Sequence, residues 1–323
     1  MTVSRVVNNS GYFSQETRER VEQAIAELGY VPNMLARSLR FKQTKTIALV
    51  LTDITNPFFT TVARGVEDTA SEQGFSVMFC NTDESETEEA EYLNVLLQKQ
   101  VDGVLLVPAN CSSESVAFLR DRGTPVVVLD RRISDDRVDV VRGDSEQGAY
   151  QLVRYLLELG HRRIAVLNGP QSISTAADRV VGYRRALAEA GLQADIDRVF
   201  YDQFTQESGY QMAQQALAQS PRPTALFAAT NFIASGAFRA LREVGLRVPQ
   251  DMSIAAFDDL PAELTMEPFL TVMAQPAYQM GQRATELLLR RLAGEGPPQP
   301  QELVLEPQMI IRQSTGPPPA DGS

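Results

Sequence analysis

The sequence contains no tryptophan, a single histidine and two cysteines, and it has no long apolar run. His161, Cys80 and Cys111 are too few and too far apart for a zinc site, so we expect no metal, no cofactor and two buried or half-buried free thiols. No segment approaches the ~20 consecutive apolar residues that span a bilayer, and the first residues lack the apolar core of a signal peptide. These absences predict a cytoplasmic protein that is not bound to a membrane.

Sequence motifs of common enzyme classes are missing as well. The chain has no glycine-rich dinucleotide motif, no P-loop and no nucleophile elbow. His161 falls between an expected helix and an expected strand, where a structural role is favoured over a catalytic one. Asp258 and Asp259 could form a metal pair, but no other ligand cluster accompanies them. We therefore expect a protein that is not an enzyme.

The charge of the chain is unevenly distributed. The 323 residues carry a net charge of −11, but residues 1–45 hold seven basic and four acidic side chains, a net charge of +3. The remainder therefore carries −14. Such asymmetry suggests a basic arm that meets phosphate and an acidic body that does not, although +3 over 45 residues is weak evidence alone.

Beyond residue 45, short apolar segments alternate with longer helix-like segments. The expected strands are 47–51, 77–79, 104–107, 126–129, 164–167, 226–229 and 254–257, with further strand-like segments at 303–305 and 309–311. The expected helices are 58–73, 86–100, 113–122, 147–159, 177–190, 207–219, 232–244 and 278–292. This alternation predicts parallel sheets covered on both faces. Because the strands are too many for one ordinary open sheet, the predicted fold class is α/β with two doubly wound parallel-sheet subdomains.

Polar residues follow the ends of these strands. They are Thr52, Asp53, Asn56, Asp130, Arg131, Asn168, Thr230, Asn231 and Asp258. Ligands of open α/β sheets bind beyond the carboxyl ends of the strands, so these residues should line a cleft. Charged groups beside Phe58, Phe59 and Phe204 suit a small polyol, whose hydroxyls and apolar face they can both contact. The alternative is that each polar residue only caps the helix that follows it.

Two short helices are expected before residue 30. The first places Val3, Val6 and Val7 at helical spacing, and Ser14 is a suitable N-cap for the second, which Gly29 would end. The apolar stripe of the second helix consists of Val21, Ala24, Ile25 and Leu28. Two such helices bury little surface alone, and the start looks as though a preceding helix were missing.

Residues 31–45 can form a third short helix. Pro32 suits its first turn, and Leu35 and Leu39 share one face at i,i+4. A helix of about two turns is marginal in water, so it should form only when something else holds it. From this segment alone, an ordinary linker and a functional joint are equally plausible.

Three motifs occur together: TVSRVVN at 2–8, ELGYVPNMLARSL at 27–39 and GLRVPQDMSIAAFDD at 245–259. With them the sequence resembles, over essentially residues 2–314, the LacI/GalR family of bacterial transcription regulators. The resemblance implies a partial helix-turn-helix head at 1–30, a hinge helix and linker at 31–45, and an effector-binding core at 46–314. The implied N-subdomain is about 46–160 and 276–294, the C-subdomain about 161–275 and 300–314, and 315–323 a disordered tail.

Carried over position by position, the resemblance implies a set of DNA contacts. Arg5 would face base edges, where its two-pronged donor geometry suits guanine, and Leu39 would wedge between base pairs in the minor groove. The full implied set is Thr2, Ser4, Arg5, Asn8, Tyr12, Ser14, Asn33, Ala36 and Leu39.

The resemblance also implies an effector site. Its residues are Phe58, Phe59, Asp130, Arg131, Arg179, Phe204, Thr230, Asn231, Asp258 and Gln275. The Asp130–Arg131 pair resembles members that sense sugars more than those that sense purines. Thr230–Asn231 departs from the Asn–Asp of many members, which leaves the individual hydroxyl contacts open.

The expected function is a DNA-binding regulator, a repressor, that binds a pseudo-palindromic operator as a homodimer and responds to a small effector such as a sugar. The family's head begins about 15–20 residues earlier, so Met1 is either an internal methionine or the start of a truncated head; the first is favoured. With a truncated head, the alternative is a sugar-binding receptor without functional DNA binding.

Overall fold

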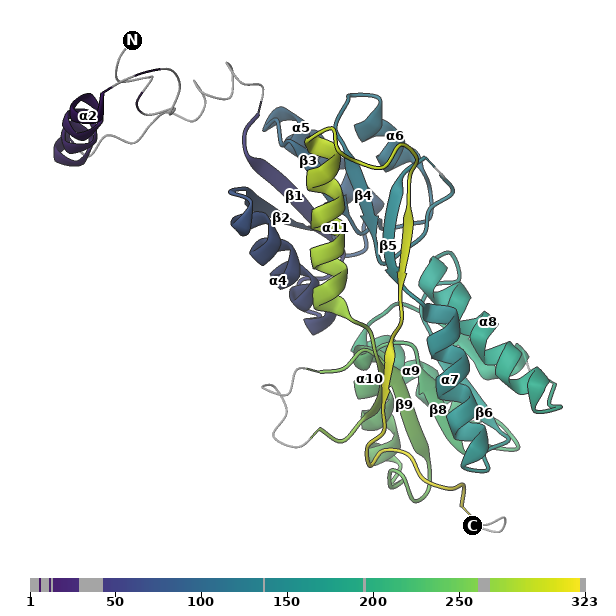
Figure 1. Cartoon of the computed structure of the whole chain (residues 1–323). Coiled ribbons are helices and arrows are strands. Elements are labelled where there is room, and N and C mark those ends of the chain that lie inside the picture. Colours follow the sequence, from purple (N-terminus) through teal and green to yellow (C-terminus); the bar gives the residue numbers. More distant parts are fainter. Residues whose placement is uncertain are drawn as a thin grey trace. The chain divides into compact units, whose positions relative to one another are not determined.

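The computed structural model describes Val6, Tyr12 and residues 14–28, 43–135, 137–193, 196–260 and 268–319. The chain divides into two compact units, residues 1–44 and residues 45–323 (Figure 1). We call the second unit the core unit.

The first unit contains helix α2 (Gln15–Leu28). Ser14 Oγ accepts a hydrogen bond of 3.3 Å from the Thr17 amide, so the predicted N-cap is confirmed. No residue of α2 is buried, and the Tyr12 side chain is exposed, whereas Val6 is buried. The other DNA-contact residues that the sequence predicts lie outside the described residues: Thr2, Ser4, Arg5, Asn8, Asn33, Ala36 and Leu39.

The core unit contains two sheets, each covered by helices on both faces (Figure 1). The first sheet has the strand order β11-β5-β4-β3-β1-β2, and all its paired strands are parallel. Its strands are β1 (Thr46–Leu51), β2 (Ser76–Asn81), β3 (Gly103–Leu106), β4 (Val126–Leu129), β5 (Asp139–Gly143) and β11 (Glu302–Leu305). Helices α4 (Pro57–Glu72) and α11 (Ala277–Leu292) pack on one face, and α5 (Glu86–Gln98) and α6 (Glu114–Arg120) on the other. We call this half the first lobe.

The second lobe repeats this plan with the order β12-β10-β9-β8-β6-β7. Only β12 is antiparallel to its neighbour. The strands are β6 (Ile164–Asn168), β7 (Val199–Tyr201), β8 (Ala225–Ala228), β9 (Ser253–Phe257), β10 (Thr271–Ala274) and β12 (Gln308–Ile310). Helices α7 (Ser145–Glu158) and α8 (Ser174–Glu189) cover one face, α9 (Gln206–Leu217) and α10 (Asn231–Glu243) the other, and a short 3₁₀ helix spans Ile196–Arg198. The predicted fold class is confirmed.

The sheets divide the chain differently from the predicted subdomain boundaries. Helix α7 packs against α8 in the second lobe, so the chain changes lobe near Gly143 and not near residue 160. Strand β11 lies in the first lobe, beside β5, where Leu303 and Leu305 pack on the core. The chain therefore crosses between the lobes a third time between β11 and β12.

The residues after 314 also differ from the predicted disordered tail. The Thr315 hydroxyl lies 2.9 Å from Thr271 Oγ1 and 3.1 Å from the Tyr155 hydroxyl. The Gly316 carbonyl accepts hydrogen bonds from His161 Nε2 and Ser253 Oγ. Contacts with the second lobe thus continue beyond the predicted boundary. Among the helices that the structure describes, none is both long enough and apolar enough to span a bilayer.

Candidate functional site

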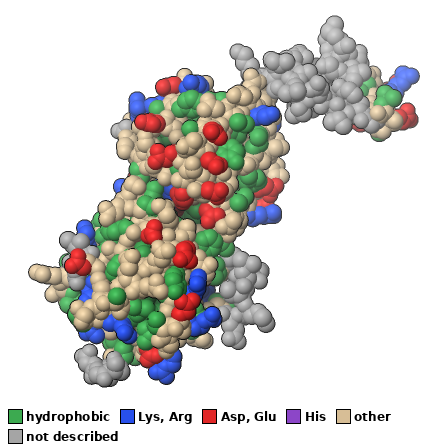
Figure 2. All heavy atoms as spheres, turned by 180° about the vertical axis from the view of Figure 1, so that it is seen from behind, with side chains coloured by type: hydrophobic (Ala, Val, Ile, Leu, Met, Phe, Trp, Pro, Cys, Tyr) green, Lys and Arg blue, Asp and Glu red, His purple; other side chains and the backbone are tan. Residues whose placement is uncertain are grey.

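A cavity of about 570 Å³ opens between the two lobes of the core unit, within the size range of small-molecule sites. Its lining contains every effector residue that the sequence predicts except Asn231. The lining residues are Thr52, Asp53, Thr55, Asn56, Phe58, Phe59, Asp83, Glu84, Ser85, Asp130, Arg131, Thr175, Arg179, Gln203, Phe204, Thr205, Thr230, Asp258 and Gln275. Acidic side chains also gather across the middle of the core unit on the face drawn in Figure 2.

The strand ends position the charged residues of this cavity. Asp130 directly follows β4 and Asp258 directly follows β9. Both have left-handed backbone conformations, with φ of 64° and 65°. Aspartate tolerates this region better than most residues, and such conformations concentrate at functional sites.

Two predicted cleft residues are also helix caps. Asn56 Oδ1 accepts a hydrogen bond from the Phe58 amide at the start of α4, and Thr230 Oγ1 accepts one from the Ile233 amide at the start of α10. The capping interpretation is therefore correct for both residues. It does not exclude the cleft, because both side chains also line the cavity.

Aromatic rings form the apolar part of the lining. Phe58 and Phe59 lie edge to face, with ring centroids 5.0 Å apart. Phe204 packs so closely on Gly169 that a Cβ there would lie 2.1 Å from two ring carbons. Gly169 therefore sets the depth at which the Phe204 ring enters the second lobe.

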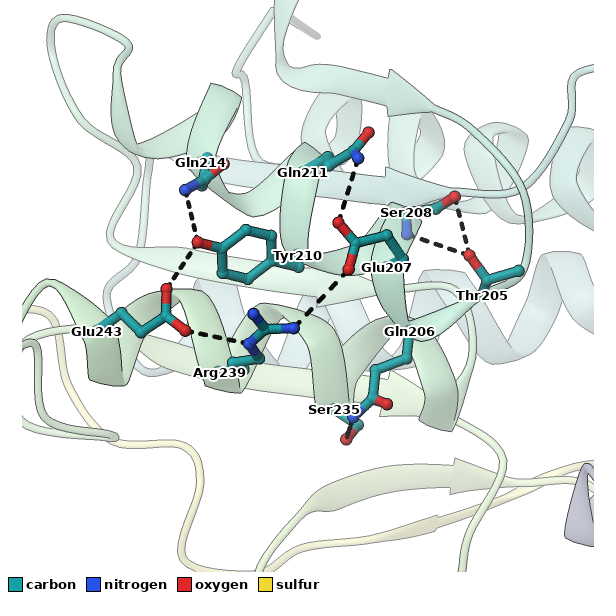
Figure 3. A network of polar contacts seen from close by, with 10 residues as sticks. All are labelled: Thr205, Gln206, Glu207, Ser208, Tyr210, Gln211, Gln214, Ser235, Arg239 and Glu243. Carbon is teal, nitrogen blue, oxygen red and sulfur yellow. Dashed lines mark hydrogen bonds and ion pairs between the residues drawn. The ribbon is translucent and has the colours of Figure 1, made fainter.

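The helix that follows Phe204 is anchored to α10 by a polar network (Figure 3). Thr205 caps α9 by accepting a hydrogen bond from the Ser208 amide. Arg239 of α10 bonds Glu243 and lies 3.7 Å from Glu207 of α9. The Tyr210 hydroxyl donates to Glu243, which joins the helices a second time. The network fixes the start of α9, and with it Phe204 and Thr205 in the cavity wall.

Arg131 is held by Glu84, a residue that the sequence prediction missed. Arg131 Nη1 and Nη2 donate to the two Glu84 carboxylate oxygens at 2.6 and 2.5 Å, and Nη1 also donates to the Pro108 carbonyl. Glu84 lies in the loop after β2, three residues beyond the strand. No sequence motif marks Glu84, because its role depends on Arg131, which only the folded chain brings beside it.

The electrostatics differ between the two arginines of the cavity. Arg131 is almost fully buried but faces Glu84 and Asp130, and these charges keep its pKa raised despite burial. Burial lowers the pKa of Arg179, whose guanidinium stacks 4.2 Å from the Phe257 ring centroid. Arg179 Nε has no hydrogen-bond partner.

Both aspartates of the cavity are difficult to ionise. Burial raises the pKa of Asp258 to about 6, against the opposing effects of Arg179 and of the Gln275 amide, which donates to Asp258 Oδ1 at 2.8 Å. Burial also raises the pKa of Asp130, although Arg131 and Arg179 oppose it. Burial is the largest cause for both groups; a nearby carboxylate raises the pKa further in each case, Glu84 that of Asp130 and Asp130 that of Asp258.

Several buried polar atoms around the cavity have no hydrogen-bond partner among the residues that the structure describes. The acceptors are Asp130 Oδ1 and Gln275 Oε1, the donors are Arg131 Nε and Arg179 Nε, and Thr52 Oγ1 can act as either. Leaving such groups unpaired costs about 1–3 kcal/mol each. Their concentration around one cavity is what a binding site for a polar molecule requires.

The remaining candidate residues have structural partners. Asn231 does not line the cavity, and its Nδ2 lies 3.4 Å from Asn56 Oδ1 of the first lobe. His161 is fully buried among Thr224, Ser253 and Gly316, which confirms its structural role. Asp259 forms a two-pronged ion pair with Arg312, and Cys80 and Cys111 are free thiols. No group of potential metal ligands occurs among the residues described.

Two doubly wound lobes that enclose a polar cavity define a ligand-binding core of the periplasmic-binding-protein type. Residues 44–302 match the family described as periplasmic binding proteins and sugar binding domain of LacI family. Residues 1–33 match the family described as bacterial regulatory proteins, lacI family. The chain belongs to the LacI family of bacterial transcriptional regulators, which confirms the resemblance carried by the sequence motifs.

Individual relatives agree with this assignment along nearly the whole chain. The HTH-type transcriptional regulator DegA of Bacillus subtilis (strain 168) is 37% identical over 321 residues, 98% of this chain and 94% of that protein. A structure of the transcriptional regulator CelR in complex with cellobiose has a TM-score of 0.78 and 36% identity, and covers 96% of this chain and 94% of that one. The Lac repressor dimer bound to operator and the anti-inducer ONPF has a TM-score of 0.84 and 29% identity, with coverages of 98% and 94%. A regulator is therefore favoured over a transport receptor, and these relatives are regulators, not enzymes.

Proposed function

We propose that this protein is a cytoplasmic repressor that binds a pseudo-palindromic operator as a homodimer. Its affinity for the operator changes when a sugar binds in the cavity between its lobes. The observation that carries the effector site is the set of unpartnered buried donors and acceptors around one cavity, beside the rings of Phe58 and Phe204. A sugar hydroxyl both donates and accepts, and the carbon face of a sugar packs on aromatic rings.

The proposed coupling follows from the position of the cavity. A ligand that contacts both lobes changes the free energy of their relative orientation, and it can shift the protein only by its differential affinity for the two orientations. Effector and operator affinities are then linked by the same factor in both directions. The proposed operator contacts are Thr2, Ser4, Arg5, Asn8, Tyr12, Ser14, Asn33, Ala36 and Leu39.

The effector site is tested by thermal shift against a panel of pentoses, hexoses and disaccharides. Binding to the folded state raises its stability with occupancy, so a ligand is detected by a higher melting temperature. Arg179→Ala should abolish the shift, because it removes a buried cation whose Nε is an unpartnered donor at the cavity. Arg184→Ala, on the exposed side of the same helix, is the matched control and should keep it. An unchanged shift in Arg179→Ala would contradict the site.

The DNA function is tested by selecting operator sequences from a random duplex pool with the full chain and measuring affinity by fluorescence anisotropy. Leu39→Ala should weaken operator binding, because an apolar side chain that unstacks a base step is lost. It should leave the effector-induced thermal shift intact. If no DNA sequence is selected, either with or without the effector identified by thermal shift, the proposed DNA-binding function is wrong.

A further inference from the structure

The charges that line the cavity are unbalanced. Five acidic side chains face it, Asp53, Asp83, Glu84, Asp130 and Asp258, but only two basic ones, Arg131 and Arg179. The lining thus carries a formal charge of −3 when all these groups are ionised. Like charges placed together in a buried site cost several kcal/mol, so this lining opposes the entry of an anion.

The first of the two arginines is already neutralised. The Glu84 carboxylate accepts hydrogen bonds from both terminal nitrogens of Arg131, and the Pro108 carbonyl accepts a further one from Nη1. The Arg131 side chain is 2% exposed and the Glu84 side chain is 26% exposed, so the guanidinium is removed from water while its carboxylate partner is partly buried. A two-pronged arginine–carboxylate pair is the geometry that an incoming phosphate would itself require from Arg131. The Glu84 carboxylate therefore already fills the position at Arg131 where an anionic group of a ligand would bind.

The position of Glu84 is built into a strained loop. Asp83 and Glu84 both have left-handed conformations, with φ of 47° and 60°. The Glu84 amide donates to the Thr52 carbonyl at 3.2 Å, and Ser85 immediately afterwards caps α5. Consecutive non-glycine residues in this region persist only where the surroundings fix them, which is typical of functional sites.

The second arginine, Arg179, does not offset the negative charge of the cavity lining. Arg179 lies between Asp130 and Asp258, and both carboxylates stabilise its charge. The unpartnered atoms of the site include both donors and acceptors. A phosphate offers acceptors alone and an ammonium donors alone, whereas a hydroxyl offers both.

We propose that the cavity selects an uncharged polyol against the phosphorylated form of the same sugar, and that Glu84, by clamping Arg131, is the residue that determines this selectivity. The inference rests on the proposed sugar effector and extends it to the charge state of the ligand. It gives Glu84 a role in specificity that is separate from contact with the sugar ring.

The test compares matched pairs by calorimetry: ribose with ribose 5-phosphate, glucose with glucose 6-phosphate, and cellobiose with cellobiose 6′-phosphate. The free sugar that binds should do so at least about 100-fold more tightly than its phosphorylated partner. Glu84→Gln keeps the size of the side chain but removes the charge that neutralises Arg131. This variant should lower the ratio of the affinity for the free sugar to that for the phosphorylated sugar by about tenfold or more, mainly because it binds the phosphorylated sugar more tightly.

Asp53→Asn is the matched control, because it removes one negative charge from the same lining without touching Arg131. It should narrow the ratio clearly less than Glu84→Gln does. If Asp53→Asn and Glu84→Gln lower the affinity ratio equally, the role proposed for the Glu84–Arg131 pair is wrong. An unchanged affinity ratio in a folded Glu84→Gln protein would also contradict it. The unmodified protein alone provides one test. If it binds the phosphorylated sugar as tightly as the free sugar, or more tightly, the inference is wrong but the proposed sugar effector is not contradicted. Failure of both members of every pair overturns the proposed effector class, and this inference with it.

Discussion

Asp130 and Asp258 occupy equivalent positions in the two lobes and face the same cavity. Each follows the third strand of its sheet order, β4 in one lobe and β9 in the other. Each amide donates to the neighbouring strand, Asp130 to the Val141 carbonyl at 2.9 Å and Asp258 to the Met273 carbonyl at 3.1 Å. The repeated architecture thus places one buried carboxylate on each side of the ligand cavity, so a ligand that donates a hydrogen bond to both joins the lobes.

The burial of Asp258 predicts a cost to stability at neutral pH. Its folded-state pKa, about 6, lies above the usual value near 4, so the folded protein loses stability from this group as pH rises from about 4 through 6. Asp258→Asn is neutral at every pH. It should therefore be more stable than the unmodified protein by about 1–3 kcal/mol at pH 7.5, and the gain should shrink toward pH 4.5. Urea unfolding at the two pH values measures this, and a less stable variant at pH 7.5 would contradict it.

Gly143 controls the partner of Asp258 from the other lobe. A Cβ at Gly143 would lie 2.1 Å from Gln275 Oε1, so Gly143→Ala must displace the Gln275 side chain and break its bond to Asp258. Because the end of a flexible side chain can move cheaply, we expect the melting temperature to change little. Affinity for the best sugar of the panel should fall about tenfold, the typical effect of losing one buried charged hydrogen bond.

Gln275→Ala provides the control for this effect, since it removes the same hydrogen bond directly. If Gly143 acts through Gln275, the double variant should bind no more weakly than either single variant. Additive losses would show that Gly143→Ala disturbs the cavity by another route.

The sequence predicted most of the described strands from their continuous apolar patterns and missed three. Strands such as β1 and β9 are buried on both faces, which leaves an unbroken apolar run. Strands β5, β7 and β10 were not predicted: β7 has three residues, and β5 carries Asp139 and Arg142. A three-residue strand and a strand with two charged residues lack the unbroken apolar run that marks β1 and β9.

The site shows the same limit. Most residues predicted at strand ends line the cavity, because parallel strands bring their carboxyl ends to one edge. Asn168 does not: it is the last residue of β6, and its Nδ2 donates to the Ala176 carbonyl at 2.9 Å. Glu84 was missed since its role depends on Arg131, 47 residues later, and only the folded chain joins the two charges. Asn231 was predicted at a strand end, but as the first residue of α10 it donates from Nδ2 to Asn56 Oδ1 at 3.4 Å and is not among the residues that line the cavity.

A contact between the lobes outside the cavity predicts a modest contribution to closure. The Arg132 amide donates to Ser174 Oγ at 2.8 Å, and the Arg132 guanidinium pairs with Asp178. Arg132 is half exposed, so the ion pair should contribute only about 0.5–1 kcal/mol. Arg132→Ala and Asp178→Ala should each weaken sugar binding about two- to fivefold, and the double variant should lose little more. Arg154→Ala, which breaks an exposed pair within α7, should have no effect on calorimetric affinity; an equal loss there would rule out a specific latch.

The segment after Ser314 predicts a different kind of dependence, on chain length. His161 is fully buried, and Nε2 donates to the Gly316 carbonyl at 2.8 Å, while the Gly316 amide donates to Ser253 Oγ at 3.0 Å. A chain ending at Ser314 loses both hydrogen bonds and leaves the buried His161 Nε2 with the Ser253 hydroxyl, 3.2 Å away, as its remaining partner, at a cost of about 0.5–1.5 kcal/mol for each bond lost. A chain ending at Pro319 keeps them and should match the full chain within about 0.5 kcal/mol. Urea unfolding of the three chains decides, because equal stability of all three would mean that the contacts of Gly316 do not contribute to the fold.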